Sequence, residues 1–173
     1  MSLKNILIYF ILAVTIISGL VWFARPDRSG AVDPTADVIS LLIGNPTEFD
    51  FGSISMAKGK VSKKFAIKNT SAGPTLIEKI YTSCMCTSAS LIVADPSTDL
   101  GQVKTFGPFG MPGHGLAPKT NQELKPGEEA QVEVIFDPAA HGPAGVGPIE
   151  RVVYVAEKGR QPLELKIKAM VTP

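Results

Sequence analysis

Two cysteines separated by one residue, Cys84 and Cys86, are the side chains of this 173-residue chain that are best suited to chemistry. They are the only cysteines, and His114 and His141 are the only histidines. Thiolates and imidazoles bind soft and borderline metal ions, and a thiol pair also exchanges with disulfides. No phosphate-binding loop, nucleophile elbow or zinc-protease helix motif accompanies them. We therefore expect a non-enzymatic protein whose chemistry is concentrated at this pair.

The Cys84–Met85–Cys86 stretch allows three interpretations. Residues two apart in an extended strand point to the same side, so both thiols would lie together and Met85 would point away. One interpretation is a buried, inert pair, because unpaired cysteine often behaves as a small apolar residue. Another is a redox-active disulfide, which would need a local turn because the Cα separation in a strand approaches about 7 Å.

The third interpretation is a metal site. Thiolates from Cys84 and Cys86, a thioether from Met111 and an imidazole from His114 suit Cu(I) better than Mg²⁺ or Ca²⁺. Zinc bound by both cysteines, His114 and His141 is the less favoured metal, since C-x-C is tighter than the usual ligand spacing. We interpret His141 mainly as a solvated loop residue.

The segments that must position these side chains alternate apolar and polar residues, as half-buried strands do. Helical periodicity is missing between them, which excludes a parallel sheet with helical crossovers. About seven short strands separated by turn residues predict an all-β, immunoglobulin-like antiparallel β-sandwich. The predicted strands contain residues 49–51, 61–67, 76–81, 90–94, 132–136, 152–155 and 163–171.

Two segments flank or interrupt this pattern. Residues 95–122 are rich in Gly and Pro, carry Met111 and His114, and are predicted to be a long, partly ordered loop. Residues 1–24 contain an uncharged apolar run from Ile6 to Phe23, which is long enough to cross a bilayer and predicts a transmembrane signal-anchor helix. A cleaved signal peptide is the alternative, although its apolar region would be unusually long. We expect a tether at 25–45 and the sandwich at 46–173.

The net charge and the distribution of basic residues indicate which kinds of binding partner to expect. The net charge is +1 and the basic residues do not cluster, so a nucleic-acid partner is not expected. Long C-terminal domains cross membranes largely regardless of flanking charge. Flanking charge therefore does not decide the orientation. We expect a single-pass membrane protein with its C-terminal domain outside the cytoplasm, in part because of the resemblance described next.

Several short motifs occur in an order that resembles a known family. They are Phe49-Asp50-Phe51-Gly52-Ser53-Ile54, Phe65-Ala66-Ile67-Lys68-Asn69-Thr70, Ser83-Cys84-Met85-Cys86-Thr87, Leu124-Lys125-Pro126-Gly127-Glu128 with the strand 132–138, and Arg151 with the final strand. The series resembles a bacterial family of uncharacterised extracytoplasmic domains with a C-x-C-T motif, related to the ASH/Hydin group of immunoglobulin-like modules. The family pattern has Gly at the position of Met85 and a shorter connection before Leu124. The resemblance implies a fold and a place in the bacterial cell envelope, and it implies little about activity.

Three functions follow as expectations. The first is a membrane-anchored extracytoplasmic binding or scaffolding module with a protein partner in the cell envelope. The second is a Cu(I)-binding protein or chaperone that uses Cys84, Cys86, Met111 and His114. The third, and weaker, is a thiol–disulfide redox protein.

Overall fold

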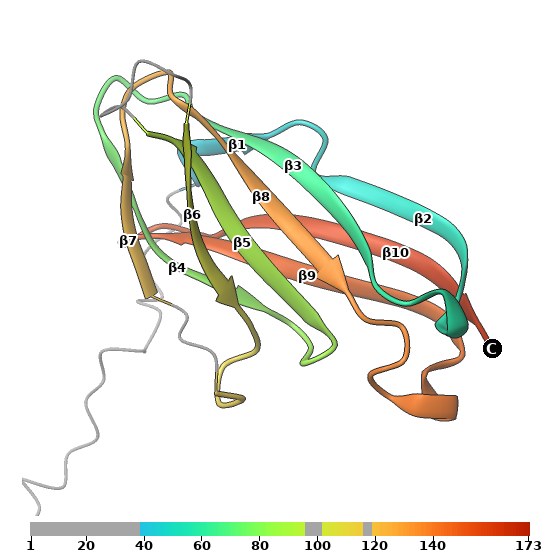
Figure 1. The fold of residues 1–173 in the computed structure, drawn as a ribbon. Coiled ribbons are helices and arrows are strands. Elements are labelled where there is room, and N and C mark those ends of the chain that lie inside the picture. Colours follow the sequence, from blue (N-terminus) through green and yellow to red (C-terminus); the bar gives the residue numbers. More distant parts are fainter. Residues whose placement is uncertain (1–38, 96–101, 116–118) are drawn as a thin grey trace, which may run out of the picture. The chain divides into compact units, whose positions relative to one another are not determined.

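The computed structural model describes residues 39–95, 102–115 and 119–173. Within these ranges ten strands form two five-stranded sheets that pack face to face (Figure 1). Two short 3₁₀ helices, η1 (Met56–Lys58) and η2 (Gly142–Gly145), lie in connections between strands. The predicted all-β sandwich is therefore confirmed.

The first sheet has the order β1-β3-β8-β5-β6 and is antiparallel throughout. Its central strand β8 pairs with β3 on one side and with β5 on the other. The strands are β1 (Leu42–Gly44), β3 (Val61–Asn69), β8 (Glu129–Phe136), β5 (Thr87–Ala94) and β6 (Val103–Phe109).

The second sheet has the order β2-β10-β9-β4-β7. It departs from the predicted antiparallel arrangement at one edge, where β2 pairs with β10 in parallel. The chain crosses from the first sheet to the second between β1 and β2, at the cis peptide bond Asn45–Pro46. The strands are β2 (Glu48–Ser55), β10 (Leu163–Thr172), β9 (Gly147–Glu157), β4 (Thr75–Thr82) and β7 (Lys119–Leu124).

The core lies between the two sheets and follows the apolar alternation of the sequence. In β10, Leu165, Ile167, Ala169 and Val171 are buried, whereas Glu164 and Met170 are exposed. Phe65 in β3 and the inward residues of β8 and β5 face them from the first sheet. Full burial of one such side chain stabilises the fold by about 1.5–3 kcal/mol, so this interface holds the site loops in place.

The segment predicted as a long loop, residues 95–122, contains two strands instead. β6 forms one edge of the first sheet and β7 forms one edge of the second. Each strand buries one large side chain, Phe109 in β6 and Leu124 in β7. The remaining residues of both strands are exposed or half-buried, so the segment has no periodic apolar pattern.

The beginning of the chain differs from the prediction in one respect. β1 lies inside the segment predicted as a tether, because Leu42 is buried in the core at 2% exposure. The predicted transmembrane helix at residues 1–24 and the first part of the tether fall outside the described residues. Among the residues that are described, none of the helices has the length and apolar character to cross a membrane.

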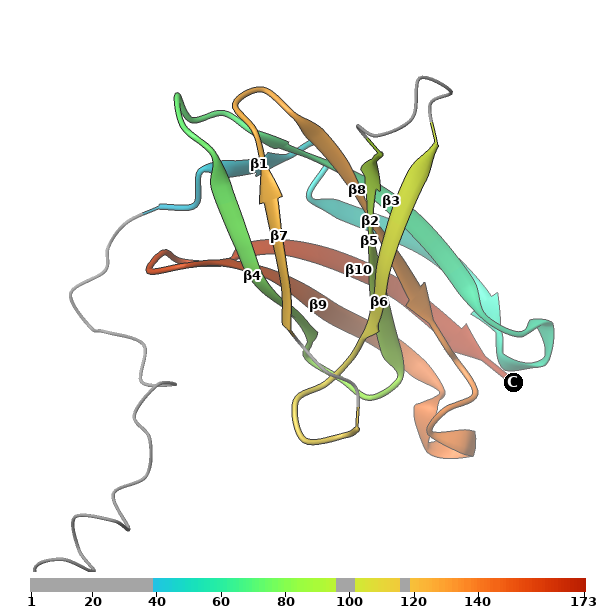
Figure 2. The ribbon, with the colours of Figure 1, turned by 60° about the vertical axis from the view of Figure 1, so that its left-hand side comes forward.

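Three connections gather at one end of the sandwich, as Figures 1 and 2 both show. They are the β4–β5 turn, the segment that follows β6, and the β8–β9 connection that contains η2. Backbone hydrogen bonds join them: the Thr82 N–H donates to the Gly110 carbonyl (3.3 Å), and the Asp137 N–H donates to the Cys86 carbonyl (2.9 Å). Both cysteines lie at this end.

Candidate functional site

Cys84 and Cys86 lie on a tight turn between β4 and β5. The Thr87 N–H donates to the Cys84 carbonyl (3.1 Å), which closes a four-residue turn. The turn brings the two Cα atoms to 5.3 Å, and the cysteines are joined as a disulfide. This separation is within the usual disulfide range. The motif is therefore a turn rather than extended backbone, and the local turn that a bridge requires is present.

The turn forms because β4 belongs to the second sheet and β5 to the first, so the chain must cross between sheets here. The hydroxyl of Thr82, which is 1% exposed, lies 2.9 Å from the Cys84 carbonyl and 3.1 Å from the Thr87 carbonyl. Ser83 fixes the other side of the turn. Its N–H donates to the Val152 carbonyl (2.9 Å), and its Oγ accepts from the Val152 N–H (2.9 Å).

The β8–β9 connection brings an imidazole to the same place. Asp137 begins this connection, and its Oδ1 accepts a hydrogen bond from the Ala139 N–H (3.0 Å). This is the local turn that Asp side chains favour. Because the Asp137 N–H also binds the Cys86 carbonyl, the turn is tied to the cysteine motif and presents His141 to it.

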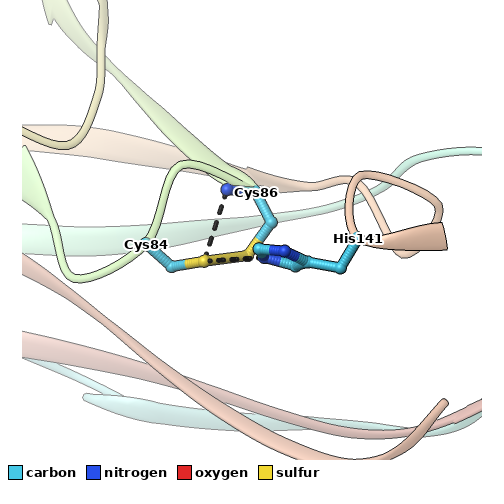
Figure 3. Close-up of side chains that lie close together, drawn as sticks. All are labelled: Cys84, Cys86 and His141. Carbon is cyan, nitrogen blue, oxygen red and sulfur yellow. Dashed lines mark hydrogen bonds between the residues drawn. A yellow bond between two sulfur atoms is a disulfide. The ribbon is translucent and has the colours of Figure 1, made fainter. Parts of the chain in front are cut away.

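His141 lies against the disulfide, as Figure 3 shows. Its Nε2 is 3.3 Å from the Sγ of Cys84. The two sulfurs and one imidazole nitrogen all lie within 4.8 Å of one another. His141 is exposed, Cys84 is half-buried, and Cys86 is buried at 3% exposure, so the cluster spans the surface and the edge of the core.

Arg151 supplies a positive charge to the buried cysteine. Its Nε donates to the Sγ of Cys86 (3.3 Å), and its Nη1 donates to the Glu150 carbonyl (2.8 Å). Arg151 lies on β9, directly before the Val152 that binds Ser83, so the same strand fixes both the turn and the guanidinium. A guanidinium beside a cysteine favours the thiolate over the thiol when the disulfide is reduced.

The predicted metal ligands are brought together in part. Among the described residues, the Cys/His/acidic cluster at this end contains Cys84, Cys86 and His141 but not His114. His114 is exposed in the turn after β6, where its N–H donates to the Met111 carbonyl (3.2 Å). The histidine expected to be solvated, His141, therefore contacts Cys84.

Sequence reasoning gave Arg151 no chemical role, although Arg151 belongs to the motif series that carried the family resemblance. Its contact with Cys86 spans 65 residues of sequence, and the contact of His141 with Cys84 spans 57. Spacing along one strand or one turn does not reveal contacts of this kind. They exist because β9 and the β8–β9 connection meet the β4–β5 turn.

The disulfide closes a very short loop, with a sequence separation of 2. Chain-entropy arguments give about 1.6 kcal/mol for a loop of this size, against about 3 kcal/mol for a 15-residue loop. The bridge therefore contributes little to the stability of a core that is already packed without it. In the oxidised state the site is a covalent S–S bond flanked by an imidazole and a guanidinium, and in the reduced state it offers two thiols and an imidazole.

Comparison with known proteins places the fold. A family model described as "Protein of unknown function (DUF1573)" matches residues 42–99, from β1 past the end of β5, and this stretch includes both cysteines. No curated protein matches the chain. A protein of unknown function from Porphyromonas gingivalis W83 is 17% identical, with a TM-score of 0.50 over 75% of this chain. The shared fold is the two-sheet β-sandwich described above.

The sandwich covers 46% of the Porphyromonas gingivalis protein, so it spans about half of that protein's length. The ASH/PapD-like domain 7 of human CEP192 is 13% identical, with a TM-score of 0.41 over 83% of this chain and 94% of that one. The periplasmic chaperone SfaE is also 13% identical, with a TM-score of 0.34 over 76% of this chain and 57% of that one. Because a shared fold does not determine function, the activity of the present chain has to be argued from its own residues.

Proposed function

We propose that this chain is a non-enzymatic binding module of the cell envelope that recognises an extended segment of a partner protein along the outer edge of β6. In this proposal the predicted helix at residues 1–24 holds the sandwich at the membrane, outside the cytoplasm. The observation that carries the proposal is the weak protection of the first part of the β6 edge, Val103–Thr105.

The other sheet edges carry the features that prevent strand addition. Edge strands are normally kept from pairing by shortness, by charge or by irregularity. β1 has three residues, β7 exposes Lys119 and Glu123, and β2 exposes Glu48 and Asp50 and pairs with β10 through a register shift. The last part of β6 is protected in a similar way, because it contains Pro108 and pairs with β5 through a register shift. The first part of β6, Val103–Thr105, has neither feature, and its lysine, Lys104, is paired with Asp95 at 3.2 Å.

The first part of β6, Val103–Thr105, exposes both backbone peptide groups and an apolar side chain. Val103 is 61% exposed at the start of the strand. The Asp95 N–H donates to the Gln102 carbonyl (2.8 Å), so the alternation of an antiparallel ladder turns the peptide groups of Val103 and Thr105 away from β5. An added strand takes its hydrogen bonds from such outward groups.

A hollow of about 190 Å³ lies beside this edge on the outer face of the first sheet. Its lining is mainly aliphatic, with two polar side chains. The lining residues are Ala66, Ile92, Val93, Ala94, Val103, Glu129, Ala130 and Gln131. The hollow lies over β3, β8 and β5 and reaches β6 at Val103, so a strand added to the outer edge of β6 would lie beside its rim and contact it through Val103.

Site-specific photocrosslinking in intact cells tests the edge. A photoreactive residue at Thr105 is expected to give a discrete adduct with one envelope protein, whereas the same residue at Glu123 on the β7 edge gives none. Val103→Lys should abolish the adduct, because a charge on the edge opposes strand addition. Equal adducts from both positions, or an adduct that survives Val103→Lys, would refute recognition along β6.

Extraction and protease protection test the tether and the location. If residues 1–24 span the bilayer, sodium carbonate leaves the full chain in the membrane pellet. If the sandwich lies outside the cytoplasm, external protease digests it once the outer layers of the cell envelope have been made permeable. Release by carbonate would refute the membrane tether without bearing on the β6 edge.

The second candidate function is binding of a soft metal ion, with Cu(I) favoured over zinc. The observation in its favour is the approach of two sulfurs and one imidazole nitrogen to within 4.8 Å. Once reduced, this set supplies the thiolate and imidazole donors that suit copper. Anaerobic Cu(I) titration of the reduced chain against a chelator should show weaker binding in Cys84→Ser and His141→Ala. The matched controls His114→Ala and Met111→Leu should be unchanged; weaker binding in these two would instead favour the set predicted from sequence.

A further inference from the structure

We infer that Cys84 and Cys86 form a thiol–disulfide exchange site in which Cys84 receives the attacking thiolate and Cys86 leaves as a thiolate beside Arg151. The co-reactant is a thiol compound or a dithiol partner protein. The inference goes beyond the β6 proposal, because it concerns the β4–β5 turn rather than the Val103–Thr105 edge and uses none of the β6 residues.

The two sulfurs differ in their access to solvent. Cys84 is half-buried and lies beside the exposed His141, whereas Cys86 is 3% exposed and belongs to the core cluster. An incoming thiolate must approach the sulfur that it attacks, and access is one determinant of which sulfur reacts. The mixed disulfide therefore forms on Cys84.

The buried sulfur has the better environment for a leaving group. The Nε of Arg151 donates to the Sγ of Cys86 at 3.3 Å, and β9 holds Arg151 in place. A thiol that ionises more readily leaves faster in disulfide exchange. The positive guanidinium therefore assists cleavage of the S–S bond in the direction that releases Cys86.

The reaction balances with two equivalents of thiol. The first thiolate, RS⁻, forms a bond to the Sγ of Cys84, the Cys84–Cys86 bond breaks, and Cys86 departs with the electron pair. A second thiolate then attacks the R-side sulfur of the mixed disulfide, which releases Cys84 as a thiolate and gives R–S–S–R. The protein disulfide gains two electrons, the two thiols lose two, and the protons released by the two thiols are available to Cys84 and Cys86.

His141 is placed to move one of these protons. Its Nε2 lies 3.3 Å from the Sγ of Cys84, which is within reach for transfer to the sulfur released in the second step. Its exposure connects the ring to solvent, from which the proton can be replaced. His141 is therefore the group expected to deliver a proton to the Sγ of Cys84 in the second step.

The turn does not rely on the S–S bond for its shape. Hydrogen bonds from Thr82, Ser83 and Asp137 hold the backbone on both sides of the cysteines. Reduction would leave these bonds in place, so the sulfurs stay close enough to re-form the disulfide. A site that cycles between the two states needs this property.

The experiment uses the full chain and glutathione as the probe. Oxidised protein is mixed with reduced glutathione, the reaction is quenched with acid, and the mixed disulfide is located by peptide mass spectrometry. We expect glutathione on Cys84 and not on Cys86, and about tenfold slower reduction in Arg151→Gln, because the leaving thiolate loses its cation. Arg151→Lys should recover most of the rate, and His114→Ala should not change it.

A second measurement avoids variants that disturb folding. Alkylation of the reduced wild-type chain should label Cys84 before Cys86, because Cys84 is the more accessible sulfur. Labelling of Cys86 first, reduction rates that ignore Arg151, or two thiols that stay reduced in oxidised glutathione would each overturn the exchange site. None of these results would affect crosslinking at β6.

Discussion

The carboxylate of Glu157 accepts the backbone N–H of Leu41 at 2.8 Å, across 116 residues of sequence. Glu157 is 4% exposed at the end of β9, and its Oε2 also accepts the hydroxyl of Ser40 (2.9 Å). The next residue, Leu42, is buried in the core. The contact therefore fixes the point at which the N-terminal segment enters the sandwich.

Glu157→Ala should destabilise the chain by about 2 kcal/mol, because it leaves the Leu41 N–H without a partner in a half-buried site. Glu157→Gln should cost much less, since an amide oxygen can accept from Leu41 and its NH₂ can donate to Ser40. Urea unfolding of the full chain and hydrogen exchange at Leu41 measure both effects. Equal losses in the two variants would mean that the negative charge, rather than the hydrogen bond, is required.

Asn69 is a second buried polar anchor, at 0% exposure. Its Nδ2 donates to the Gly73 and Leu124 carbonyls (both 2.9 Å), and its Oδ1 accepts from the N–H (2.9 Å) and hydroxyl (2.7 Å) of Ser71. The side chain thus joins the β3–β4 turn to the end of β7 in the second sheet.

Asn69→Ala should lower the free energy of unfolding by about 3 kcal/mol, because buried carbonyls lose their donors. Asn69→Asp should cost at least as much above neutral pH, since a carboxylate then faces two carbonyl oxygens. Chemical denaturation measures both, with the exposed Gln131→Ala as a control expected to stay within about 0.5 kcal/mol of wild type. A loss in Asn69→Ala no larger than that of the control would contradict this role.

The strands that could be predicted are those that bury every second residue. β10 and β3 do so over most of their length, and their apolar alternation is visible in the sequence. β6 and β7 were missed because each of these edge strands buries only one large residue, Phe109 and Leu124 respectively. Their sequences therefore lack the apolar alternation that marks a half-buried strand. The parallel pairing of β2 was missed because strand direction depends on where the chain changes sheets, which no local pattern records.

The candidate site was predictable in part for a similar reason. The two cysteines are separated by one residue, so the sequence alone identifies them as a pair. Their two non-local neighbours, His141 and Arg151, arrive from a connection and a strand that are distant in sequence. His114 shared the residue type and the Gly-rich setting of His141, so composition alone could not tell which ring would meet the sulfur.

Tyr81 gives a prediction about alkaline pH. Burial, followed by the neighbouring Tyr154 and Glu164, raises the pKa of Tyr81 above its ordinary value of 10.0. The ring stacks on Tyr154 with centroids 4.9 Å apart. The unfolded chain therefore ionises first, and the stability that neutral Tyr81 contributes is complete below about pH 10 and is lost as the pH rises through the raised pKa.

Stability curves against pH for wild type and Tyr81→Phe should separate above about pH 10, with the wild type falling more steeply. Ultraviolet titration of tyrosinate should show one fewer late-ionising group in the variant. Parallel curves through this range would show that Tyr81 ionises equally in the folded and unfolded chains.

Reduction of the Cys84–Cys86 disulfide should leave the sandwich folded and cost about 1.6 kcal/mol or less, because the closed loop is too short to restrict the unfolded chain much. The hydrogen bonds of Thr82 and Asp137 hold the turn independently of the bridge. Urea unfolding with and without reductant measures the difference, and Cys84→Ser/Cys86→Ser gives the same comparison without reductant. A loss above about 4 kcal/mol would lie in the range of disulfides that close long loops. It would indicate that the bridge is structural, and it would contradict a role in thiol–disulfide exchange.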